Sequence, residues 1–286
     1  MPGGGLCFFF RAPVPGSMDV ATGASAGLSH AMMNPQPTAA DRPISPGVAK
    51  AALAVERYVL PWAYGYFAWQ RIWPGLEHYA AYRRLAEHGT EPMLASVAAA
   101  AAAKDLLLFL LMVFTGATLL FSRAPVTLPD RLKHLLVPVA MSYYFFLYGM
   151  VDRLPEPLRQ NLLPPAWQIP AAVGGLLLSL LGYAISIWAL IHLGRSFAML
   201  VSVRKVVSTG PYAYVRHPIY LGYVIDLCGL LLTNFSPAML LLGAGFIAFL
   251  IVRARLEEEM LSATDAGYRE NVARTGFLLP RFSGRR

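Results

Sequence analysis

Long apolar segments dominate this sequence and limit what it can fold into. A helix needs about 20 mostly apolar residues to cross a bilayer, and a helix satisfies its own backbone hydrogen bonds there. The segments that qualify are Val48–Ile72, Met93–Phe121, Leu132–Val151, Ile169–Leu193, Ile219–Asn234 and Pro237–Val252. The sequence therefore predicts an all-α, polytopic membrane helix bundle with about six transmembrane helices and a cytoplasmic helical segment at the C-terminus.

The composition supports a membrane protein. Charged residues make up 14% of the chain, against about 25% in soluble domains, and the mean hydropathy is +0.49. The net charge of +8 comes from basic residues beside the apolar segments, which favours a lipid bilayer as the partner over nucleic acid. Because Cys7 and Cys228 are the only cysteines, we expect no disulfide framework and no metal site.

The chain divides into three predicted regions. Residues 1–46 are rich in Gly, Pro, Ala and Ser and are predicted to be a disordered tail. Residues 47–168 hold the first transmembrane helices, of which Val48–Ile72 is the weakest because it contains charged residues and Pro61. Residues 169–286 hold the last three apolar segments. A short turn around Phe235 joins the final two, which predicts a tight helical hairpin.

Basic residues set the predicted orientation, because Lys and Arg favour the cytoplasmic side. One side of the membrane receives the basic residues of 123–133 and 195–216 and of the C-terminal tail. That side is predicted to be cytoplasmic, and both ends of the helical hairpin face it. We expect an integral protein of a bacterial inner membrane with its site facing the cytoplasm.

A polar string from Gly210 to Gly222 precedes the fifth apolar segment. Pro218 suits the first position of a helix, so the helix begins at the membrane surface with unpaired N–H groups. Such a helix end attracts a carboxylate or phosphate, and Arg216 and His217 add donors. The alternative is an ordinary interfacial belt of tyrosine and arginine.

A second polar cluster, residues 253–259, directly follows the last apolar segment. Its arginines and glutamates could form i,i+4 pairs on a solvated helix face. Glutamates near a helix C-terminus, however, oppose the helix dipole. The cluster therefore indicates a cationic partner, on the same side of the membrane as the string.

Ionisable residues also lie inside apolar segments. Asp226 shares a helix face with Gly222 and Gly229, so a hydrogen bond to a neighbouring helix and a substrate contact are both open. Lys104 and Asp105 lie on another apolar segment and could mark an edge or a kink of that helix.

These motifs resemble the isoprenylcysteine carboxyl methyltransferase and phospholipid methyltransferase superfamily. The resemblance covers about residues 170–282. It rests on Leu193–Phe197, Gly210-Pro211-Tyr212, Val215–Gly222, the helical hairpin, Glu257-Glu258, Leu261, Tyr268 and Pro280. Arg204-Lys205 departs from the family pattern, in which acidic residues or histidine are frequent.

The resemblance implies an integral membrane enzyme that uses S-adenosylmethionine and methylates a lipid or lipid-modified acceptor. The implied cofactor-binding residues are Gly210, Pro211, Tyr212, Arg216, His217, Pro218, Tyr220, Gly222, Glu257 and Glu258. The implied catalytic residues are Arg253 and Arg255, which would hold an acceptor carboxylate, and His217. Glutamates suit the cofactor's ammonium or ribose, and arginine suits its carboxylate.

Two other functions stay open at this stage. Membrane reductases of the sterol-reductase type, which use NADPH, carry a similar string, but usually with Glu where this chain has Tyr223. A non-enzymatic membrane or transport subunit would be supported only by Asp226 and the Lys104-Asp105 pair. The acceptor itself, whether a carboxylate, an amine or a hydroxyl, is not readable from the sequence.

Overall fold

The fold is described from a computed structural model, over residues 39–89, 92–148 and 150–281. Of the predicted N-terminal tail, residues 1–38 lie outside these ranges, and the described part, residues 39–46, contains a 3-10 helix and the start of the first α-helix. The α-helices are α1 (Pro46–Tyr58), α2 (Leu60–His88), α3 (Pro92–Leu120), α4 (Lys133–Tyr148), α5 (Glu156–Arg159), α6 (Pro165–Leu193), α7 (Pro218–Thr233), α8 (Pro237–Thr264) and α9 (Ala266–Arg274). Short 3-10 helices are η1 (Ala39–Asp41), η2 (Val151–Arg153), η3 (Gly194–Ser196) and η4 (Gly210–Ala213). Within the described ranges the β-structure is limited to isolated bridges, so the predicted all-α class is confirmed.

Three described helices are long and apolar enough to cross a membrane: Pro92–Leu120, Pro165–Ser196 and Pro237–Thr264. Helix α7 is apolar but shorter. The total of six spans stays a prediction.

The first apolar segment differs from the prediction. Val48–Ile72 was expected to be one helix, but it divides at Val59, between α1 and α2. Pro61 lies in the first turn of α2, where its missing N–H costs no hydrogen bond. Helix α2 then continues well past Ile72, to His88. The chain thus accommodates Pro61 by beginning α2 there.

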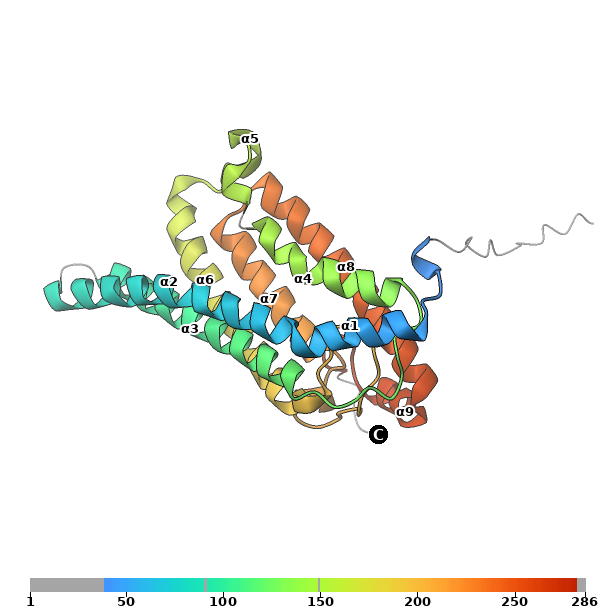
Figure 1. Cartoon of the computed structure of the whole chain (residues 1–286). Helices are drawn as coiled ribbons and strands as arrows, with labels where there is room; N and C mark the ends of the chain where they lie inside the picture. Colours follow the sequence, from blue (N-terminus) through green and yellow to red (C-terminus); the bar gives the residue numbers. More distant parts are fainter. Residues whose placement is uncertain (1–38, 90–91, 149, 282–286) are drawn as a thin grey trace, which may run out of the picture. The chain divides into compact units, whose positions relative to one another are not determined.

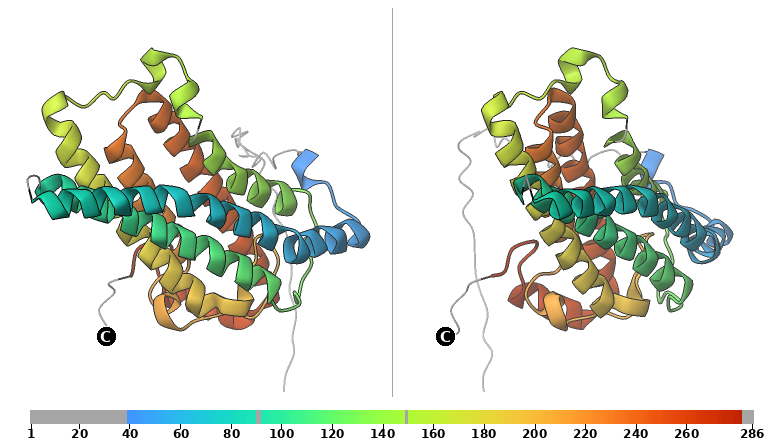
Figure 2. Two further views of the ribbon diagram at one scale, coloured as in Figure 1. Left: turned by 60° about the vertical axis from the view of Figure 1, so that its left-hand side comes forward. Right: turned by 90° about the vertical axis from the view of Figure 1, so that its left-hand side faces the viewer.

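Pairs of helices organise the structure. Figure 1 shows α2 and α3 side by side, and α6 and α7 likewise. Figure 2 gives two further views, in which α8 lies along α4. Helix α3 also packs on α6, and α7 on α8.

Glycines allow α6 and α7 to approach closely. A Cβ on Gly175 would overlap the carbonyl oxygen of Gly229, and a Cβ on Gly222 would overlap the hydroxyl of Ser186. Close backbone contact through small residues is the usual way in which membrane helices pack. This contact fixes α7, whose N-terminus carries the polar string.

The turn between α7 and α8 is short, as predicted for a helical hairpin. The Ser236 hydroxyl accepts a hydrogen bond from Met239 N, 3.4 Å away, and Pro237 begins the helix. Helix α8 then runs beyond its apolar part to Thr264. The hairpin therefore returns residues 253–258 to the N-terminal end of α7.

Candidate active site

The polar string and the C-terminal segment are joined by backbone hydrogen bonds. Arg216 N donates to Gly276 O at 2.9 Å, and His217 N donates to Phe277 O at 3.3 Å. The string bends at Gly210, whose φ of +60° is a left-handed conformation that glycine adopts readily. Its missing Cβ also leaves room for the ring of His192. These contacts hold Arg216 and His217 at the start of α7.

Arg216 makes the central ion pair of the site. Its Nε donates to Glu258 Oε1 at 2.5 Å, and its Nη1 donates to the carbonyl oxygens of Val272 and Thr275 at 3.2 and 2.7 Å. The guanidinium also lies over the ring of Phe277, 5.7 Å from the centroid. Arg216 therefore ties together the start of α7, helix α8 and the C-terminal end of α9.

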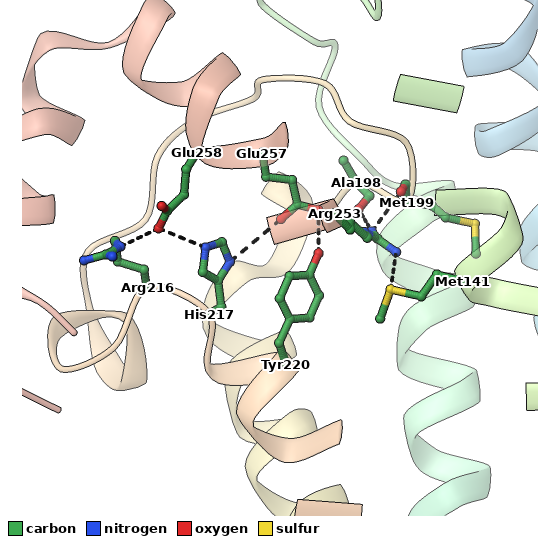
Figure 3. Close-up of polar contacts among 9 residues, drawn as sticks. All are labelled: Met141, Ala198, Met199, Arg216, His217, Tyr220, Arg253, Glu257 and Glu258. Carbon is green, nitrogen blue, oxygen red and sulfur yellow. Dashed lines mark hydrogen bonds and ion pairs between the residues drawn. The ribbon is translucent and has the colours of Figure 1, made fainter. Parts of the chain in front are cut away.

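His217 lies between the two glutamates, as Figure 3 shows. Its Nε2 is 3.2 Å from Glu258 Oε1, and its Nδ1 is 3.9 Å from Glu257 Oε2. The imidazole stacks on Tyr220 with 5.2 Å between ring centroids. A buried imidazole held between two carboxyl groups is well placed to hold or pass on a proton.

Glu257 organises the other half of the site. Its Oε1 accepts hydrogen bonds from the Tyr220 hydroxyl at 2.5 Å and from Arg253 Nε at 3.0 Å. The Arg253 guanidinium lies over the Tyr220 ring, 5.7 Å from the centroid. The i,i+4 pair predicted on a solvated face is therefore largely buried, with the Arg253 side chain 8% exposed.

The connector between α6 and the string is held from two directions. Arg253 Nη2 donates to Met199 O at 2.8 Å. On the same residue, Met199 N donates to Oε1 of Glu56 in α1 at 2.6 Å. Glu56 also pairs with Arg204, 3.5 Å away, and both side chains are almost fully buried. Arg204, the departure from the family pattern, thus serves to anchor the connector.

A cavity of about 550 Å³ extends from this polar cluster into the apolar helices. Its polar lining includes Arg216, His217 and Glu257, and the connector residues 196–207 form another wall. Its apolar lining includes Phe67 of α2 and Leu108 of α3. One continuous space therefore meets both charged groups and membrane-helix side chains.

The predicted site residues fall into three groups. Those that line the cavity are Tyr212, Arg216, His217, Tyr220, Arg253 and Glu257. Those that do not line it are Gly210, Pro211, Pro218, Gly222 and Glu258. Both prolines are buried, Gly222 packs on α6, and Glu258 pairs with Arg216. Arg255 is exposed, whereas Arg253 is 7% exposed. The structure therefore separates the two arginines that were predicted to act together.

Two sets of residues were given no role in the site from the sequence, although Tyr268 is among those that carry the family resemblance. Tyr268 and Asn271 of α9 line the cavity beside Glu257. Burial raises the pKa of Tyr268, so its hydroxyl stays a proton donor, and that hydroxyl has no hydrogen-bond partner. Glu56 could have been singled out as a charge inside an apolar segment, but nothing in the sequence names Arg204 as its partner.

Taken together, the long apolar helices indicate an integral membrane protein, and its cavity is lined by both charged and apolar side chains. Residues 170–265 match the family model of phospholipid methyltransferases. This match confirms the predicted resemblance to the superfamily and supports an integral membrane methyltransferase.

Among solved structures, one match is reported by name. It is that of the eukaryotic intramembrane Ras methyltransferase ICMT (isoprenylcysteine carboxyl methyltransferase), with 17% sequence identity and a TM-score of 0.42. The alignment covers 85% of this chain and 100% of that one. No curated protein sequence matches the chain.

Proposed function

We propose that this chain is an S-adenosylmethionine-dependent methyltransferase that acts on a lipid or lipid-modified acceptor, with its site facing the cytoplasm of a bacterial cell. The observation that carries the proposal is one continuous cavity, bounded by Arg216, His217 and Glu257 at one end and by apolar helices at the other. Such a space suits a water-soluble cofactor and a lipid-dissolved acceptor together.

The residues at the polar end fit this cofactor. Arg216 can hold a carboxylate, Glu257 can accept hydrogen bonds from an ammonium group or a ribose hydroxyl, and aromatic rings of Tyr212 and Tyr220 can face a cation. The unpartnered hydroxyl of Tyr268 is a further donor that a ligand could satisfy. When bound, S-adenosylmethionine supplies an electrophilic methyl group on a sulfonium.

The chain's own residues would then position and shield the reactants. The connector, held by Glu56 and Arg253, closes one wall of the cavity and excludes water, which favours an in-line displacement. A carboxylate acceptor needs no base, and Arg253 would orient it. An amine or hydroxyl acceptor loses a proton, which His217 or Glu257 could take up.

Calorimetry on the purified protein in detergent tests the cofactor. We expect saturable binding of S-adenosylmethionine and of its product S-adenosylhomocysteine, and weaker or no binding of NADPH. Binding of NADPH without S-adenosylmethionine would overturn the proposal in favour of a membrane reductase. The same protein, mixed with bacterial polar lipid extract and tritium-labelled methyl donor, should transfer label to a lipid fraction.

A further inference from the structure

The cavity continues past the polar cluster to a second polar region within the helices. Asp226 lines it and is 3% exposed. It lies six residues beyond Tyr220 on α7, which at 1.5 Å per residue is about 9 Å further along the helix. Tyr183 of α6 lines the cavity beside Asp226, and the lining of the cavity also includes the hydroxyl groups of Tyr64, Thr115 and Ser142, from α2, α3 and α4.

Most of these hydroxyl groups have partners within the protein. The Thr115 hydroxyl donates to Leu111 O at 2.7 Å, and that of Ser142 donates to Pro138 O at 2.8 Å. Ser179 and Tyr183 of α6 interact with the Asp226 carboxyl. Oδ1 of Asp226, however, is buried without a hydrogen-bond partner. Asp226 therefore keeps an acceptor atom that the protein does not satisfy.

A buried polar atom without a partner is costly, and the cost is relieved when a ligand supplies the missing hydrogen bond. A carboxylate oxygen accepts, so the complementary group is a hydroxyl or an amine N–H. The group must be carried by an otherwise apolar molecule, since apolar side chains such as Leu108, Leu111 and Met112 also line the cavity.

We propose that Asp226 is a specificity-determining residue that selects acceptors carrying a hydroxyl or amine hydrogen-bond donor on an apolar chain. This proposal rests on the proposed function, because it assigns the inner part of the cavity to the acceptor.

Three probes that differ only at the polar end test the proposal: farnesol, farnesylamine and farnesyl methyl ether. Their binding is measured by displacement of tritiated farnesol from the full chain in detergent. Because one hydrogen bond to a charged group is at stake, wild type should bind the alcohol or the amine about tenfold more tightly than the ether. Comparison of the affinities for farnesol and farnesylamine shows which of the two donors, the hydroxyl or the amine, is preferred.

The test variant is Asp226→Asn, which keeps the size of the side chain and removes its charge. We expect it to reduce the preference over the ether to less than about threefold. The matched control is Asp105→Asn. Asp105 is also a buried carboxyl on an apolar helix, but it pairs with His78 at 2.8 Å and is not part of this cavity's lining. It should keep the wild-type preference.

Binding of S-adenosylmethionine to the same preparations separates this proposal from the proposed function and reports folding. An Asp226→Asn protein that binds the cofactor normally but no longer distinguishes the probes supports the proposal. Equal wild-type affinity for all three probes, no saturable farnesol binding, or an unchanged preference in Asp226→Asn would overturn it. If the wild-type protein does not bind S-adenosylmethionine, the proposed function is overturned instead.

Discussion

Arg216 and Glu258 are separated by 42 residues in the sequence, yet Nε of the arginine donates to Oε1 of the glutamate at 2.5 Å. The two residues occupy the start of α7 and the polar end of α8, so their contact closes the helical hairpin at one surface. The same Oε1 atom lies 3.2 Å from Nε2 of His217. One glutamate therefore positions two cavity-lining side chains without itself lining the cavity.

Glu258→Gln is expected to weaken binding of S-adenosylmethionine at least about tenfold. The amide cannot balance the charge of Arg216, and a buried charge that loses its partner is strongly disfavoured. Calorimetry on the purified variant measures the effect. Glu259→Gln is the matched control, because Glu259 is the exposed neighbour. If both variants bind the cofactor like wild type, the glutamates do not support a cofactor site.

The helices and the polar string could be predicted from local patterns, whereas the pairings across the fold could not. Apolar segments gave the positions of α3, α6, α7 and α8, because helix formation in a bilayer depends on composition over about 20 residues. The positions of Lys and Arg also predicted that Arg216 and the glutamates lie on the same side of the membrane, but not that they form an ion pair.

The remaining contacts depend on tertiary packing. Glu56 makes the first apolar segment less typical of a transmembrane helix, but in the structure it pairs with Arg204. Tyr268 lies on a polar helix with no apolar signal. Arg253 and Arg255 are equivalent in sequence, and only the rotation of α8 makes one buried and the other exposed.

Gly210→Ala should destabilise the protein more than Gly89→Ala. Both glycines have positive φ, +60° and +66°, so alanine at either position costs about 1–2 kcal/mol of backbone strain. A Cβ at Gly210 would also overlap the ring of His192, whereas one at Gly89 meets nothing within 4 Å. Thermal unfolding in detergent should therefore show a larger fall in midpoint for Gly210→Ala. Equal falls would mean that the His192 contact is unimportant.

Adjacent glycines of α6 offer a test of the contact with α7. Gly175→Ala would press a methyl group into the backbone of Gly229, and such overpacking costs about 1–3 kcal/mol. Gly174→Ala meets nothing within 4 Å and should be neutral or slightly stabilising. Unfolding of the two variants in the same detergent measures the difference. A tolerated Gly175→Ala would contradict the close approach of these helices.

Glu56→Ala should loosen the connector as well as destabilise the fold. It leaves the buried guanidinium of Arg204 without its ion-pair partner and removes the acceptor of Met199 N. Breaking a buried pair in this way costs about 3–5 kcal/mol. Limited proteolysis should then cut within residues 197–209 faster than in wild type. Glu77→Ala, which alters an exposed glutamate of α2, should leave both the stability and the cleavage pattern unchanged.

Arg253→Lys and Arg255→Lys should separate the two arginines that the family resemblance treats alike. Arg253 donates simultaneously to Glu257 and to Met199 O and lines the cavity. A lysine ammonium cannot reproduce this planar, forked set of donors, so transfer of label from the methyl donor to bacterial polar lipids should fall by at least about tenfold. Arg255 is exposed, so its replacement should change the rate by less than about twofold. Equal losses for the two variants would contradict the distinction between a buried Arg253 and an exposed Arg255.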